Sequence, residues 1–155
     1  MRKKFKWVIG AILLLFLLLQ FTNPARTNPP VKNDLIASTH PPAAVAAMLR
    51  GACYDCHSHE TVWPWYARVV PGSWLVTSDV NGGRAHVDFS EWPANPALAV
   101  RKLDWIYEVL AHHEMPPPQY TLVHASARLT QTQQQELLNW INAEAQKQMA
   151  AAQTH

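Results

Sequence analysis

The sequence is poor in the residues that several common small folds require. Its 155 residues include only two cysteines and five glycines, beside twelve prolines and seven tryptophans. Two cysteines are too few for a disulfide-dense secreted scaffold, and five glycines do not suit a barrel built on glycine turns. The length fits one domain and is too short for two ordinary domains joined by a linker.

Basic charge is also scarce outside the first 27 residues. Five of the Lys and Arg residues lie there, and the other 128 residues carry eight against eleven Asp and Glu, a net charge of −3. A domain that binds nucleic acid is expected to be basic where it folds, so no nucleic-acid partner is expected. The net charge of +2 therefore belongs to the N-terminal segment.

Large aliphatic residues are scarce in the same 128 residues. Leu, Ile, Val and Phe number 25 there, about a fifth of the total, which is near the level of charged chains that stay unfolded. Another source of apolar volume must therefore contribute to the core. Six tryptophans and many alanines are the first candidates for that role.

The N-terminus predicts an export signal over residues 1–21. Arg2, Lys3, Lys4 and Lys6 precede an uncharged apolar run over residues 7–21. The run is shorter than the ~20 residues that span a bilayer comfortably, but no small-residue cleavage site follows it. We therefore favour an uncleaved signal anchor over a cleaved signal peptide. The basic start keeps the N-terminus in the cytoplasm, so the domain is expected on the periplasmic side of the inner membrane.

The exported part shows no strand-like alternation of apolar and polar residues, and four of its segments have helical patterns. They are residues 43–50, residues 73–80 stopped by Gly82-Gly83, residues 95–112 opened by Asn95-Pro96, and a segment opened by a Thr130-x-x-Gln133 capping box. We expect a Pro-rich extended stalk over residues 22–38, an all-α domain with long irregular linkers over residues 39–149, and a disordered tail over residues 150–155.

Both cysteines lie in the pentapeptide Cys53-Tyr54-Asp55-Cys56-His57. The pattern C-x-x-C-H is the attachment signal for c-type haem, in which two thiols add to the two vinyl groups of one haem. The adjacent imidazole then serves as the proximal iron ligand. We therefore expect one covalently attached haem c, with Cys53 and Cys56 as the attachment sites and His57 as a metal ligand. The haem would supply the missing core volume.

Three other uses of the two cysteines are less favoured. A thioredoxin-like site needs a preceding strand in a βαβ setting, and the sequence shows neither. A structural zinc site needs four ligands, and Cys53, Cys56 and His57 are too crowded to supply three of them easily. A plain disulfide between Cys53 and Cys56 remains open for an exported protein.

Met115 is the best candidate for the sixth iron ligand. It follows the third helical segment and precedes three prolines, residues 116–118, which predict a stiff non-helical loop. His86 and His124 are the main alternatives. Further candidates are His40, His59, His112, His113, His155, Met48 and Met149; of these, His112 and His113 are expected at a helix C-terminus, and His155 and Met149 near a fraying end.

Haem propionates need partners, and several residues after the attachment site could provide them. The candidates are Trp63, Tyr66, Arg68, Trp74 and Arg84, each of which could equally be a core aromatic or a surface cation. The aromatic run at residues 63–66 is expected to pack on the porphyrin edge.

The pattern as a whole resembles the bacterial haem-binding domain family of small exported proteins. The resemblance covers about residues 26–142 and includes Arg26-Thr-Asn-Pro-Pro30, the stretch from Cys53 to Trp63-Pro-Trp-Tyr66, Pro71-Gly-Ser-Trp74, Asp79 with Gly83 and His86, Phe89-Ser-Glu-Trp92, and Met115-Pro-Pro with Tyr120 and His124. It implies one c-type haem on a membrane-tethered or periplasmic domain, loaded by the haem attachment machinery, and no assigned reaction. Pro118 departs from the family, where aromatic residues often stand.

The order of elements is also similar to class I cytochromes c, in which the first helix crosses the last. Ala46, Ala47 and Gly51 would permit such a crossing here, with Trp140 or Ile141 as the large partner. Iron made six-coordinate by His57 and Met115 would have a raised potential, which favours electron transfer to an unidentified redox partner over an enzymatic role. The alternatives are a haem-based sensor or gas-binding module, a haem peroxidase that uses His86 and Arg84, and a scaffold in which haem is structural.

Overall fold

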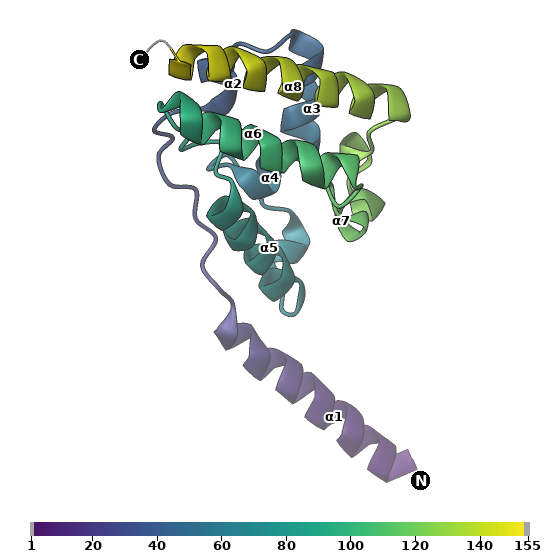
Figure 1. Ribbon diagram of the computed structural model, residues 1–155. Helices are drawn as coiled ribbons and strands as arrows, with labels where there is room; N and C mark the ends of the chain where they lie inside the picture. The colour runs from purple at the N-terminus through teal and green to yellow at the C-terminus, as the bar shows by residue number, and fades with distance from the viewer. Residues whose placement is uncertain (1, 154–155) are drawn as a thin grey trace.

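Helices make up the fold of this computed structural model, which describes residues 2–153 (Figure 1). The elements are α1 (Arg2–Leu19), η1 (Gln20–Thr22), α2 (Leu35–Thr39), α3 (Ala43–Ala52), α4 (Tyr54–His57), η2 (Trp65–Arg68), α5 (Gly72–His86), α6 (Pro96–Ala111), α7 (Pro118–Val123), η3 (Ala125–Ala127) and α8 (Gln131–Gln153). No β-strand occurs within this range, so the expected all-α class is confirmed.

Helices α6 and α8 lie side by side and antiparallel along one edge of the domain (Figure 1). Both begin at the caps that the sequence predicts. The Asn95 side chain accepts hydrogen bonds from the backbone N–H groups of Ala97 and Leu98. Thr130 and Gln133 bond reciprocally, with the Gln133 N–H donating to Thr130 Oγ1 and the Thr130 N–H to Gln133 Oε1. Caps of this kind typically contribute about 1 kcal/mol each.

The apolar core lies between α2, α3, α6 and α8. Its buried members include Leu35, Val45, Met48, Leu49, Phe89, Trp92, Leu103, Ile106, Leu110, Leu137 and Ile141. Each fully buried Leu or Ile contributes roughly 1.5–3 kcal/mol relative to an exposed one. Helices α3 and α8 are in contact, and Ile141 belongs to this core. A close crossing through Ala46, Ala47 and Gly51 stays a prediction, and Ala47 is exposed. Gly51, however, lies against the Ser126 carbonyl: a Cβ there would stand 3.0 Å from its oxygen.

The tryptophans fill less of the core than the composition suggests. Trp92 is buried, and Trp105 and Trp140 pack at the edge of the core. Trp65 and Trp74, by contrast, are exposed. The scarcity of aliphatic residues is therefore not compensated by tryptophan alone.

Helix α5 extends further than the sequence predicts. The expected stop at Gly82-Gly83 is wrong, because the helix runs through both glycines to His86 and neither has a positive φ. Gly83 instead allows a close approach between helices. A Cβ on Gly83 would stand 2.6 Å from the Cys56 carbonyl oxygen, whereas a Cβ on Gly82 would meet nothing within 4 Å. Gly83 alone thus lets α5 lie against α4.

The segment after α1 lies along the domain, and it is not extended over the whole of the predicted stalk, residues 22–38. Residues 23–31 contain no helix, but α2 (Leu35–Thr39) begins inside the predicted stalk, where Asp34 provides its N-cap. The Asn23 side chain donates to the Arg68 carbonyl, and Arg26 donates to the Ala67 carbonyl. The N–H groups of Lys32 and Asn33 both donate to the Ser90 carbonyl. At the other end, α8 continues to Gln153, into the segment expected as a tail; residues 154–155 lie outside the described residues.

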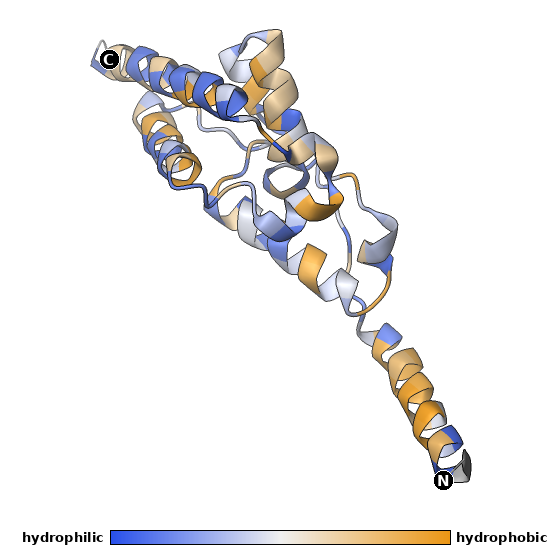
Figure 2. Ribbon diagram, turned by 90° about the vertical axis from the view of Figure 1, so that its right-hand side faces the viewer, coloured by the Kyte–Doolittle hydropathy of each residue, from blue (hydrophilic) through white to orange (hydrophobic). Residues whose placement is uncertain are grey.

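Helix α1 projects away from the domain with its apolar side chains exposed (Figure 2). It is the one helix within residues 2–153 that is long and apolar enough to cross a membrane, over Lys4–Thr22. A helix of this kind near an N-terminus fits either a signal sequence or an anchor.

Gly83→Ala should destabilise the protein by about 1–3 kcal/mol, because the added Cβ collides with the Cys56 carbonyl of a packed backbone. Gly82→Ala is the matched control. It should raise stability by about 0.5–1 kcal/mol, since alanine has the higher helix propensity. Thermal unfolding followed by circular dichroism measures both, and equal shifts for the two variants would contradict the close approach.

Candidate functional site

The pentapeptide lies at the junction of two helices. Cys53 ends α3, where its N–H donates to the Leu49 carbonyl, and its own carbonyl accepts from the N–H of His57 in α4. Cys53 therefore stands at the junction, while Cys56 and His57 are the last two residues of the single turn α4. No signal beyond the motif itself predicts the break between α3 and α4.

The two variable residues of the motif fix it to neighbouring elements. Tyr54 is buried, and its hydroxyl donates to Asp34 Oδ1 at 2.8 Å, beside the N-cap of α2. The Asp55 carboxylate accepts from the Val62 N–H at 2.9 Å and from the Tyr120 hydroxyl of α7 at 2.7 Å. Sequence reasoning missed both roles, because the pattern C-x-x-C-H leaves these positions free.

His57 is buried and held in one orientation. Its Nδ1 lies 3.0 Å from the Val87 carbonyl oxygen, which is an acceptor, so Nδ1 carries the proton. Burial lowers the pKa of His57, although the carbonyls of Val87 and Gly83 oppose this shift. The ring is therefore neutral near pH 7. Nε2 is the nitrogen that can bind a metal ion, and the Val87 contact is the kind that orients a ligating imidazole.

Cys53 and Cys56 are free thiols. Burial raises the pKa of Cys53 to about 12 and is the largest cause that raises the pKa of Cys56 to about 11. Both side chains therefore stay protonated at neutral pH. Within residues 2–153, no three His, Cys, Asp or Glu side chains converge to hold a metal ion, a convergence that the structural zinc alternative would need.

Two neighbouring cavities surround these residues, and the residues fit a haem. A narrow cavity of about 30 Å³ is lined by Cys53, His57 and Met115, and a wider one of about 280 Å³ by Cys56, His57 and Met115. Ala52 and Trp105 line both cavities. The structure thus places all four predicted site residues on the linings of two cavities, and His57 and Met115 line both of them.

A third cavity of about 220 Å³ continues on the far side of Cys56. It shares Cys56, Asp79 and Tyr120 with the wider cavity. Of the aromatic run at residues 63–66, Tyr66 lines this cavity beside Pro64, whereas Trp63 and Trp65 are absent from its lining and Trp65 is 77% exposed. That the run packs on a porphyrin edge stays a prediction.

Met115 lies in the turn between α6 and α7, where its N–H donates to the Val109 carbonyl at 3.2 Å. The expected non-helical run of three prolines is correct for Pro116 and Pro117 only. Pro118 begins α7, because proline is tolerated in the first turn of a helix. Met115 is therefore held between two helices within a short turn.

The alternative ligands differ in their surroundings. His86 shares the wider cavity with Met115, and its ring stacks on Trp105 with centroids 5.8 Å apart. His124 lines the third cavity, and both of its ring nitrogens have partners, the Tyr66 hydroxyl and the Tyr120 carbonyl. His112 caps the C-terminal end of α6, as expected.

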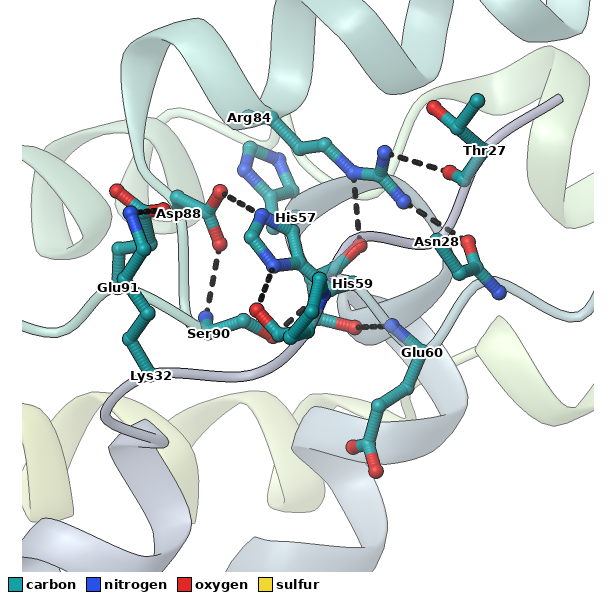
Figure 3. A network of polar contacts seen from close by, with 12 residues as sticks. Thr27, Asn28, Lys32, His57, His59, Glu60, Arg84, Asp88, Ser90 and Glu91 are labelled. Atoms are coloured by element: carbon teal, nitrogen blue, oxygen red, sulfur yellow. Dashed lines mark hydrogen bonds and ion pairs between the residues drawn. The ribbon is translucent and has the colours of Figure 1, made fainter. Parts of the chain in front are cut away.

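His59 is a buried histidine with a structural role. Its Nε2 lies 2.8 Å from Asp88 Oδ2 and its Nδ1 lies 3.0 Å from the Pro30 carbonyl oxygen (Figure 3). Both ring nitrogens are engaged, so His59 links the N-terminal segment to the loop after α5. Met48 is part of the apolar core, and Met149 is an exposed residue of α8.

The Arg84 guanidinium joins backbone and side-chain acceptors on the segments around the motif, and we call this set of hydrogen bonds the Arg84 clamp. Its guanidinium donates to the carbonyls of Ser58 and Thr27 and to Asn28 Oδ1, all within 3.1 Å (Figure 3). It also donates to Thr61 Oγ1 at 2.9 Å. A role as a propionate partner is therefore disfavoured for Arg84. The indole N–H groups of Trp63 and Trp74 are also engaged, with Asn28 and the Thr22 carbonyl.

Comparison with known proteins gives one match. A family model described as a haem-binding domain matches residues 14–143 of the chain, well over half of its length. No curated protein matches the chain, and no solved structure matches it. The match extends from the apolar helix α1 into α8, and so includes all four predicted site residues.

Arg84→Lys should destabilise the protein by about 1–3 kcal/mol, because one ammonium cannot replace a planar fork that binds four acceptors. The extended segment around Thr27 and Asn28 should also become accessible to protease. Arg101→Lys, on the exposed face of α6, is the control and should change neither. Limited proteolysis and thermal unfolding test this, and a segment that stays protected in Arg84→Lys would contradict the clamp.

Proposed function

The chain belongs to the haem-binding domain family, with haem as its cofactor, and we propose that it is a membrane-tethered electron carrier with one covalently attached haem c. The observation that carries this proposal is that Cys53, Cys56, His57 and Met115 line two cavities that have His57 and Met115 in common. The four side chains supply two thiols, an imidazole and a thioether, the set that a mono-haem carrier uses.

Attachment depends on the two thiols. Each thiol adds its sulfur and its proton across one vinyl double bond, so no atom is lost and no oxidant is consumed. The pKa values of about 12 and about 11 keep both protons on the thiols until addition. Because Cys53 and Cys56 line different cavities, they would hold the cofactor from two sides of His57.

His57 and Met115 would hold the iron. His57 offers a neutral Nε2, since its Nδ1 proton is committed to the Val87 carbonyl. Met115 offers a thioether from the turn that follows α6. The haem iron supplies a one-electron couple, whose potential a His and Met ligand pair raises. The His57 ring is held by the Val87 carbonyl, and the Met115 backbone by the Val109 carbonyl.

Helix α1 would tether the domain to the inner membrane. It is long and apolar enough to cross a bilayer, and the basic residues before it favour a cytoplasmic N-terminus. The domain would then lie on the periplasmic side, where haem attachment takes place. Its net charge of −3 beyond residue 27 suits redox partners with basic surfaces.

A sensor or gas-binding role is the second candidate. His86 lies in the same cavity as Met115 and is exposed, so it could stand beside a site from which Met115 is displaced. A role as a haem peroxidase is less favoured, because a peroxidase needs a free distal arginine and the Arg84 guanidinium already donates hydrogen bonds to four acceptors.

Cys53→Ser with Cys56→Ser should abolish covalent haem, because a hydroxyl does not replace the thiol in the addition. Mass spectrometry of the denatured protein, expressed with the haem attachment machinery, should show the mass of the bare chain. The exposed cavity residue Ser78 provides the control, since Ser78→Ala should retain one haem. A double variant that still carried covalent haem would contradict the assignment of the attachment sites. Without its haem, the double variant should also lose much of its helicity.

Met115→Ala should open the sixth coordination position. The ferric variant should lose the sulfur-to-iron absorption band of the wild type. The ferrous variant should bind carbon monoxide rapidly, whereas the ferrous wild type should not. Met149→Ala, on an exposed part of α8, is the control and should keep the wild-type spectrum. An unchanged spectrum in Met115→Ala would remove Met115 as ligand, and rapid carbon monoxide binding by the wild type would favour the sensor.

A further inference from the structure

The end of α1 is fixed to one end of the haem domain. The Gln20 side chain bonds to both backbone groups of Val70, at 3.0 Å and 3.4 Å. The Trp74 indole N–H donates to the Thr22 carbonyl at 3.3 Å. The first turn of α5 therefore lies directly beside the last residues of the apolar helix, as both ribbon views show (Figures 1 and 2).

Large apolar side chains gather on the surface around this joint. We define the α1-proximal face as Phe21, Trp65, Val69, Trp74 and Leu75, all of which are exposed. Trp65 is 77% exposed and Leu75 is 55% exposed. Scattered apolar residues are normal on a protein surface, but two tryptophans and a phenylalanine beside one joint are not scattered.

Acidic charge is absent from the segments that build this face. Residues 20–33 carry only Arg26 and Lys32 as charged residues, and residues 61–78 carry only Arg68. All eleven acidic residues of the chain lie outside both segments. Glu60 and Asp79 directly flank residues 61–78, and Asp79 lines the third cavity together with Leu75. The five side chains of the face are nevertheless apolar, and the one charged residue within residues 61–78 is basic, which suits a surface of anionic lipid headgroups.

We propose that the α1-proximal face rests on the outer surface of the bilayer, with Trp65, Trp74 and Leu75 in the interfacial layer. The proposal rests on the proposed tether, because it requires α1 to span the membrane. It goes beyond the tether by fixing which end of the domain faces the lipid. Arg68 then lies beside the headgroups, where a basic side chain is favourable.

The position of Trp74 along the membrane normal supports lipid, rather than a protein, as the partner of the α1-proximal face. Thr22 directly follows the apolar run, and Trp74 bonds to its carbonyl. A bilayer that takes up α1 therefore ends at the height of Trp74, which is the depth at which tryptophan is enriched in membrane proteins. Phe21 and Leu75 border the same level. A protein partner for this face would have to displace lipid from around the tether.

Lipid photo-cross-linking of the full chain tests the orientation. A photoreactive phenylalanine analogue replaces Trp65, Leu75, Leu14 or Gln135 in separate holoproteins reconstituted into vesicles of phosphatidylethanolamine and phosphatidylglycerol. Leu14 lies within α1, and Gln135 is an exposed residue of α8. We expect phospholipid adducts at positions 14, 65 and 75 and none at position 135.

The positions separate the two proposals. Adducts at position 14 without adducts at 65 and 75 would overturn the docking and leave the tether intact. No adduct at position 14 would overturn the tether and the docking together. Cross-links from positions 65 and 75 to a second copy of the chain, in place of lipid, would show that the face is a protein interface and would also overturn the proposal.

Discussion

The hydrogen bond between His57 Nδ1 and the Val87 carbonyl is the contact on which the site depends. It sets the tautomer of the imidazole and directs the other nitrogen to the cavities shared with Met115. The same loop also bonds to the motif backbone, since the Phe89 N–H donates to the His57 carbonyl. Because Val87 directly follows α5, the orientation of the ring depends on where α5 lies, and Gly83 allows α5 to contact the motif.

The surroundings of the motif are held by polar contacts more than by apolar packing. Tyr54 and Asp55 bind α2 and α7, and Arg84 and His59 bind the extended N-terminal segment. A site held in this way can keep its shape while leaving apolar cavities for a flat, rigid cofactor. The proposed site would also explain how a chain with so few aliphatic residues can fold: the aliphatic core between α3, α6 and α8 is small, and a haem held by the motif would occupy the adjoining cavities.

The sequence allowed the local features to be predicted, but not the long-range ones. The caps at Asn95 and Thr130 and the C-x-x-C-H motif act within a few residues, so their chemistry is visible in the sequence. Gly83 was misread as a helix stop, because glycine serves equally for a turn and for close packing, and only the neighbouring Cys56 carbonyl distinguishes the two. The sequence offers Arg84 as a partner for the propionates, because the four acceptors that occupy its guanidinium come from segments up to 57 residues away and cannot be recognised from the residues around it. That Met115 would share a cavity with His57 also depended on the fold.

The pinned N-terminal segment bears on how far the haem could travel. A free extended linker of that length could carry the domain roughly 30 Å from its tether, at about 3.1 Å per residue. Asn23, Arg26 and Asn33 instead hold the segment against the domain. On a membrane, the cofactor would then stay at one height above the bilayer surface, and lateral diffusion would move it only parallel to that surface. Its encounters would favour electron donors and acceptors whose own redox centres lie at that height.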